Sequence, residues 1–159
     1  MIDELGAQQI QAELNKLQYG NQDISDWEGR LNTNNDNRAL TGFWIESSLK
    51  ISPIEQAEVM ERIFGEHSLY SQDTQDALRQ VMLAQTQEKT DMRIYGKTGM
   101  GRSDGVVVDA WYTGFAEMQE GHVYFCVYLG QTEEGDVSSQ RAKEIAFDIL
   151  SAYQEGAES

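Results

Sequence analysis

The sequence predicts an α/β fold of the α+β type, in which an antiparallel sheet of at least three strands packs against helices. Helical spacing of apolar residues and helix-start signals dominate the first half of the chain. Short apolar and aromatic runs follow Thr90, and an amphipathic segment closes the chain. Of the 159 residues 40% are hydrophobic, and no linker divides them, so we expect a single domain over residues 1–159.

The first predicted helix covers residues 3–17, where apolar residues recur at helical spacing, and it stops at Gly20. A long polar loop is expected from residue 20 to residue 41, because its many Asn and Asp side chains can hydrogen-bond their own backbone. Long loops in compact domains are often functional.

Two further helices are predicted from their caps. SPIE at 52–55 is a capping box that begins a helix running to about Phe64. Ser71 caps a helix that extends to about Gln85 and is expected to be buried through four apolar residues, Ala77, Leu78, Val81 and Met82.

The second half predicts three strands, MRIYGKT, VVVDAWYTGFAEM and HVYFCVYL, joined by GRSDG and QEG as an antiparallel meander. The last helix is expected from about Ser138 to Tyr153. Its apolar stripe consists of Ala142, Ile145, Ala146, Ile149 and Tyr153.

The net charge of −15 excludes two classes of partner, nucleic acid and anionic membrane surfaces, because no Lys or Arg cluster offsets it. His67 and His122 have no second His or Cys at ligand spacing, so neither a metal nor another cofactor is expected. Cys126 lies in an apolar run, which favours a buried, unreactive thiol.

The stretch YGKTGMG at 95–101 is the strongest candidate for a binding element. The ammonium of Lys97 and the hydroxyl of Thr98 suit a carboxylate, and Gly99 would let a ligand lie along the strand. The N–H of Met100 could contribute to an oxyanion hole. The alternative is an exposed edge strand whose lysine only prevents aggregation.

Three other stretches add to this motif: YGN at 19–21, FWIESSLKISPIEQ at 43–56 and WYTGFAE at 111–117. Together they resemble the C-terminal part of the penicillin-recognising serine acyl-transferases, specifically the class D β-lactamases and the sensor domains of the BlaR/MecR antirepressors. The resemblance runs from about Leu5 to Tyr153. It implies a partial serine β-lactamase/penicillin-binding-protein-like fold.

The resemblance implies roles for individual residues. Lys97 and Thr98 match the pair that binds the β-lactam carboxylate, and Met100 stands where the family takes an oxyanion-hole amide. Trp44 resembles the tryptophan that borders the site. Its alternative is a core anchor whose indole N–H is hydrogen-bonded.

Three more residues match the family around the cleft. Tyr19 and Asn21 match the rim loop, although they could simply end a helix and shape a turn. Arg141 falls about where class D enzymes keep a second carboxylate-binding arginine, and the alternative is a solvated surface charge.

The family acylates a serine in an S-x-x-K motif, and the resemblance places that motif ahead of the first helix, upstream of Met1. The only S-x-x-K in this sequence is SSLK at 47–50. Activation needs the serine at the start of a helix with the lysine one turn on. The capping box at Ser52 begins the helix after the motif, so we interpret Ser47 and Lys50 as a decoy.

The chain is therefore expected to be the C-terminal portion of a β-lactam-binding sensor domain that is not catalytic alone. Two alternatives stay open, part of a class D β-lactamase and a non-catalytic structural domain. The expected partner is a β-lactam or peptidoglycan-like small molecule, with a homodimer or a complementing N-terminal segment covering an exposed sheet edge. The resemblance implies an extracellular or secreted location.

Overall fold

The computed structural model describes residues 2–25, 48–87, 92–103, 106–119, 121–131 and 137–157. The chain divides into two compact units, Met1–Glu55 and Gln56–Ser159. Within the described ranges, no helix has the length and apolar character needed to cross a membrane.

The first unit is built on α1 (Ile2–Leu17), which confirms the first predicted helix. Its backbone is interrupted at Gly6, whose φ of 74° is a left-handed conformation that favours glycine. A small core forms around buried Ala7 and Ile24, with Ile10, Leu14 and Leu49 packed against them. Most of the predicted 20–41 loop lies outside the described residues.

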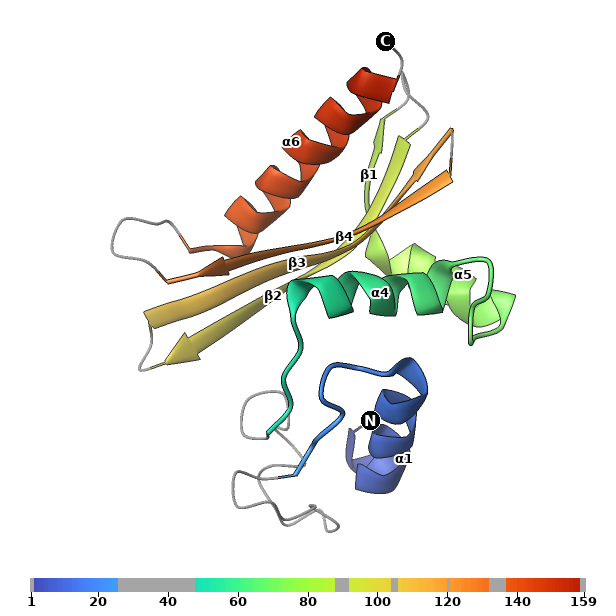
Figure 1. Cartoon of the computed structure of the whole chain (residues 1–159), viewed down its shortest axis with the longest axis vertical. Helices are drawn as coiled ribbons and strands as arrows, with labels where there is room; N and C mark the ends of the chain where they lie inside the picture. Colours follow the sequence, from blue (N-terminus) through green and yellow to red (C-terminus); the bar gives the residue numbers. More distant parts are fainter. Residues whose placement is uncertain are drawn as a thin grey trace. The chain divides into compact units, whose positions relative to one another are not determined.

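The second unit contains a four-stranded antiparallel sheet in the order β1-β2-β3-β4 (Figure 1). The strands are β1 (Leu83–Gln87), β2 (Met92–Ser103), β3 (Val106–Met118) and β4 (Gly121–Gly130). The predicted meander is β2, β3 and β4.

The prediction for β1 was wrong, because residues 83–85 were assigned to the preceding helix. That helix, α5 (Gln72–Met82), has Leu83 as its C-cap, and the φ of −58° and ψ of 114° at Leu83 are outside the helical region. Leu83 then pairs with Tyr95 of β2. Pairing with a strand that comes later in the chain overrides a helical pattern, and such pairing is not visible in a local window.

Helices cover both faces of the sheet (Figure 1). On one face, α6 (Ser139–Ala157) buries Ala142, Ala146 and Leu150. The sheet residues packed there include Tyr112 and Ile94.

On the other face, Phe64 at the end of α4 (Pro53–Phe64) stacks on Phe115 of β3, with ring centroids 4.3 Å apart. Phe115 in turn stacks on Tyr95 of β2 at 4.7 Å. Arg79 of α5 lies over both phenylalanine rings. This aromatic layer fixes the two helices on the sheet.

Two details of the predicted helix faces were wrong. Val81 of α5 is 76% exposed, and the buried residue of that helix is Gln75, which donates to the carbonyl of Tyr70. On α6, Ile149 and Tyr153 are 60% and 61% exposed, although they belong to the predicted stripe. The alanines and Leu150 of α6 carry the packing instead.

Candidate functional site

The stretch YGKTGMG lies on β2 at a point where the outer edge of the strand opens. The partner β1 pairs with β2 only from Met92 to Tyr95. On the inner side, β2 stays paired with β3 from Arg93 to Ser103. From Gly96 onward the outer edge of β2 therefore has no strand partner among the residues that the structure describes.

The four predicted binding residues lie on this open segment, and all four are exposed. Side chains alternate between the faces of a strand. Lys97 and Gly99 share the face of Tyr95, and Thr98 and Met100 share the face of Ile94, which α6 covers. The side chains of Lys97 and Thr98 can therefore meet one ligand only along the open edge.

Backbone donors alternate as well. The N–H of Gly101 points toward β3, where it donates to the Asp109 carboxylate at 2.9 Å. Since successive N–H groups of a strand point to opposite edges, those of Met100 and Thr98 point away from β3. The open edge thus carries backbone donors beside the Lys97 ammonium and the Thr98 hydroxyl.

Close packing between β2 and β3 requires glycine at two facing positions. Gly96 pairs with Gly114, the glycine of WYTG. A Cβ on Gly114 would collide with the carbonyl oxygen of Tyr95, and a Cβ on Gly96 would lie 2.5 Å from the Tyr112 ring. The two strands can approach this closely only because neither position has a side chain.

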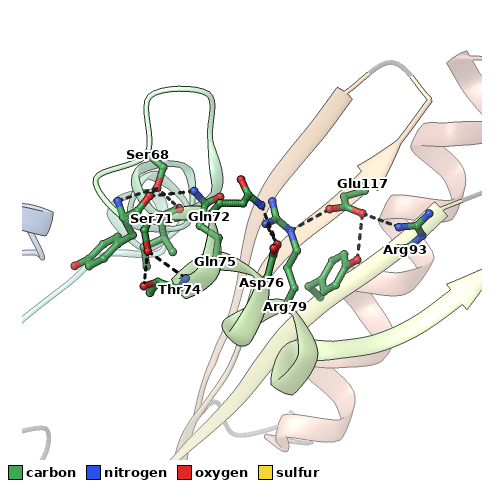
Figure 2. Close-up of polar contacts among 12 residues, drawn as sticks. Ser68, Ser71, Gln72, Thr74, Gln75, Asp76, Arg79, Arg93 and Glu117 are labelled. Atoms are coloured by element: carbon green, nitrogen blue, oxygen red, sulfur yellow. Dashed lines mark hydrogen bonds and ion pairs between the residues drawn. The ribbon is translucent and has the colours of Figure 1, made fainter.

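An ion-pair network anchors the start of the stretch. Glu117 of β3 receives Arg79 Nε at 3.2 Å, Arg93 Nη1 at 3.5 Å and the Tyr95 hydroxyl at 3.1 Å (Figure 2). Burial is the main cause that raises the pKa of Tyr95, so this phenol stays a donor to Glu117. Nothing in the sequence predicted this network, because Arg79 and Glu117 are 38 residues apart and neither belongs to a motif.

The side chain of Asn21, a predicted rim residue, forms hydrogen bonds within its own unit. Its Oδ1 accepts from the N–H of Lys50 at 2.9 Å, and its Nδ2 donates to the carbonyl of Ser48 at 2.7 Å. Gly20, at φ 51°, packs against the Lys50 carbonyl so closely that a Cβ would overlap it. In YGN, Gly20 and Asn21 therefore hold residues 48–50, while Tyr19 closes the end of α1 through its N–H to Leu14 at 2.9 Å.

The structure confirms that a helix begins after SSLK. Residues 48–50 are not helical, and α4 starts at Pro53. The capping box is present, with Ser52 N–H donating to Glu55 at 2.8 Å and Glu55 N–H to Ser52 Oγ at 3.3 Å. Lys50 is thus not on a helix that Ser47 could start. Ser47 and Trp44 themselves lie outside the described residues.

Arg141 lies in the first turn of α6, half exposed, with its Nη1 3.5 Å from Glu144. Its own N–H is capped by Ser138 at 3.1 Å. The helix that carries Arg141 covers the sheet face to which Thr98 and Met100 point. Within the described ranges, no hydrogen bond or ion pair joins Arg141 to Lys97 or Thr98.

The remaining reactive side chain is Cys126. Burial raises its pKa to about 11, and a hydrogen bond with Thr113 lowers it by a smaller amount. At neutral pH the thiol is protonated and is a poor nucleophile. Among the residues that the structure describes, no three His, Cys, Asp or Glu side chains form a metal-binding group.

The chain matches the family described as "Penicillin binding protein transpeptidase domain" over residues 1–151. It is 33% identical over 155 residues to β-lactamase OXA-1 of Escherichia coli, covering 94% of this chain and 53% of that protein. It is 26% identical over 148 residues to the regulatory protein BlaR1 of Staphylococcus aureus, covering 93% and 22%. The chain thus spans about half the length of the β-lactamase it matches.

Solved structures agree with this likeness. The class D β-lactamase of Bacillus subtilis superposes with a TM-score of 0.73 at 28% identity, over 96% of this chain and 55% of that one. OXA-427, another class D β-lactamase, superposes with a TM-score of 0.78 at 27% identity, over 98% and 64%.

Proposed function

The chain belongs to the penicillin-binding protein transpeptidase domain family, and from that premise we propose that it forms the carboxylate-binding side of a β-lactam sensor site. The observation that carries the proposal is the open edge of β2. There Lys97 and Thr98 are exposed and flanked by Gly96 and Gly99 on a strand whose other edge is fully paired.

The chemistry of this edge suits an anion. The net charge of −15 repels anionic ligands in general, so affinity for a carboxylate has to come from a local cation. Lys97 supplies one, and Thr98 adds a donor that fixes the orientation of the ligand. Gly99 has no side chain that would obstruct the ligand. We assign the N–H of Met100 to the oxyanion that would develop on the β-lactam carbonyl oxygen when a serine attacks it.

Four other residues complete the proposed site. Trp44 is proposed to border it, and Tyr19 and Asn21 to form its rim, with Asn21 acting through the backbone of residues 48–50 that it holds. Arg141 is proposed as a second carboxylate ligand. Its 3.5 Å pair with Glu144 is exposed on both sides, so releasing it costs little.

We propose that the 159-residue chain binds without being acylated. Its one S-x-x-K precedes a helix instead of starting one, and the Cys126 thiol is protonated at neutral pH. Sensor action would need a serine nucleophile from outside these residues. The second candidate is part of a class D β-lactamase, which the 33% identity to OXA-1 favours.

The proposal is tested by titrating the chain with benzylpenicillin, with affinity followed by NMR and adducts by intact mass. Saturable binding without a mass adduct is expected. Lys97→Ala should weaken binding by at least about tenfold, since it removes a charge-assisted contact. Lys16→Ala is the matched control, because it removes the same charge from an exposed helix position.

Four results would contradict the proposal or part of it. Equal affinities for Lys97→Ala and Lys16→Ala would exclude Lys97 as the carboxylate ligand, and the absence of saturable binding would exclude the site. A stable adduct that disappears in Ser47→Ala would make SSLK the nucleophile. Turnover of a chromogenic cephalosporin would favour the hydrolase over the sensor.

A further inference from the structure

The open edge of β2 ends at a β-bulge. Gly101 pairs with Asp109, but Arg102 pairs with Val107, so β3 has one extra residue, Val108, at this point. A bulge interrupts the regular ladder and bends the strand locally. The interruption falls one residue after Met100, the last residue of the proposed binding segment.

A side chain completes the ladder at the bulge. The carbonyl of Val108 is used by the N–H of Gln131 at 3.0 Å. The N–H of Gly101 is bound instead by Oδ1 of Asp109 at 2.9 Å. Hydrogen bonds to a carboxylate are stronger than those to a neutral acceptor. Asp109 therefore holds the strand at the point where backbone pairing fails.

The sequence on the other side of this bond accommodates the carboxylate. A Cβ on Gly101 would lie 2.7 Å from Oδ1 of Asp109, so the carboxylate would have to shift. Glycine at position 101 leaves the carboxylate in its place on the N–H. Gly101, the second glycine of KTGMG, thus has its partner eight positions further along the chain and directly across the sheet, in Asp109.

We propose that Asp109 is a positioning residue for the carboxylate-binding edge. By drawing the Gly101 N–H toward β3, it keeps the Met100 N–H directed to the open edge and keeps Lys97 and Thr98 in register with β3. This inference rests on the proposed function of that edge. Asp109 itself does not touch the ligand.

The effect of the Asp109 hydrogen bond on affinity can be separated from the effect of its negative charge, because the two act in opposite directions. Asp109 pairs with Gly101, which lies four residues from Lys97 on β2. Because side chains alternate between the faces of a strand, Asp109 lies on the same sheet face as Lys97. Its negative charge by itself disfavours an anionic ligand. Removing only the charge should leave affinity unchanged or raise it slightly, whereas removing the hydrogen bond should lower it.

The test uses the 159-residue chain, with benzylpenicillin as the probe and amide exchange of Gly101 followed by NMR. In Asp109→Ala, Gly101 exchange should accelerate by at least about tenfold and affinity should fall by about fivefold or more. Asp109→Asn keeps an acceptor and should stay near wild type in both. Asp148→Ala, which removes the same charge from an exposed position of α6, is the matched control.

A second variant changes the donor residue of the Gly101–Asp109 hydrogen bond. Gly101→Ala should displace the carboxylate and reproduce the loss of affinity of Asp109→Ala while Asp109 keeps its charge. Should Asp109→Ala fail to fold, Gly101→Ala therefore carries the same test.

The outcomes separate the two proposals. Faster Gly101 exchange with unchanged affinity would overturn the positioning role while leaving the β-lactam site intact. Equal gains of affinity in the Ala and Asn variants would reduce Asp109 to a repelling charge. A wild-type chain that does not bind benzylpenicillin would overturn the proposed site and, with it, the positioning role, whatever the exchange of Gly101.

Discussion

At the scale of single residues, Tyr112 stands out for its buried hydroxyl group. The side chain is buried between β3 and α6, with its ring over Gly96, and its hydroxyl has no hydrogen-bond partner within the described part of the chain. Burial raises its pKa from 10.0 to about 12. A buried hydroxyl without a partner costs folding free energy even at neutral pH, because it gives up its hydrogen bonds to water. The cost grows at the pH where the phenol of the unfolded chain ionises.

Replacing Tyr112 by Phe should therefore change the pH dependence of stability. The raised folded pKa means that the contribution of Tyr112 is complete below pH 10 and is lost as pH rises toward about 12. The loss amounts to up to about 2 kcal/mol after allowance for solvent screening. Phe neither leaves a buried hydroxyl unpaired nor ionises, so the urea midpoint of Tyr112→Phe should be at least that of wild type at pH 8 and should exceed it by a larger margin at pH 11.

The control for this prediction is Tyr153→Phe at an exposed position of α6. It should follow wild type at both pH values. A Tyr112→Phe variant that loses alkaline stability in parallel with wild type would show that other groups cause the loss, for example Cys126, whose pKa burial also raises.

At the scale of elements, the start of α4 decides how SSLK is interpreted. Ser52 and Glu55 exchange hydrogen bonds around Pro53, so the helix begins three residues beyond Lys50. The Ser52 N–H is the largest cause that lowers the pKa of Glu55. The cap is local in sequence, which is why the pattern SPIE was sufficient to predict it.

Ser52→Ala should remove the acceptor for the Glu55 N–H and destabilise the chain by about 0.5 to 2 kcal/mol. Ser52→Asp offers an equivalent acceptor and should recover most of the loss. Urea denaturation followed by circular dichroism measures both. If the Ala and Asp variants are equally unstable, the capping hydrogen bond is not what begins α4.

At the scale of the whole molecule, the outer edge of β4 is the feature that the partner proposal addresses. The strand pairs with β3 on one side, and on its other side no described strand pairs with it. Its ten residues, GHVYFCVYLG, contain no Lys, Arg, Asp, Glu or Pro. Such an edge lacks the features that prevent edge-to-edge pairing, so we propose that a second copy or a complementing segment covers it.

The 159-residue chain alone should accordingly self-associate as its concentration rises, and analytical ultracentrifugation measures this. Tyr128→Lys, which places a charge at a 44% exposed position of β4, should shift the chain toward monomer. Val81→Lys is the matched control on α5. A chain that stays monomeric at all concentrations, or two variants with equal effects, would argue against the β4 edge as the interface.

Local patterns in the sequence were sufficient to predict the class of fold, the caps of α4 and α5, and the meander of β2 to β4. Each of these depends on residues within a few positions of one another, where periodicity and capping act. The capping pattern also placed the start of α4 after SSLK, as the structure confirms.

The remaining features came from tertiary packing. It ended α5 early in favour of β1, exposed Ile149 on α6, and turned Lys97 and Thr98 to opposite faces of β2. It also joined Arg79 to Glu117 and Gly101 to Asp109. These features depend on strand register and on contacts between residues far apart in the chain, and register is set by how the whole sheet packs rather than by any local pattern.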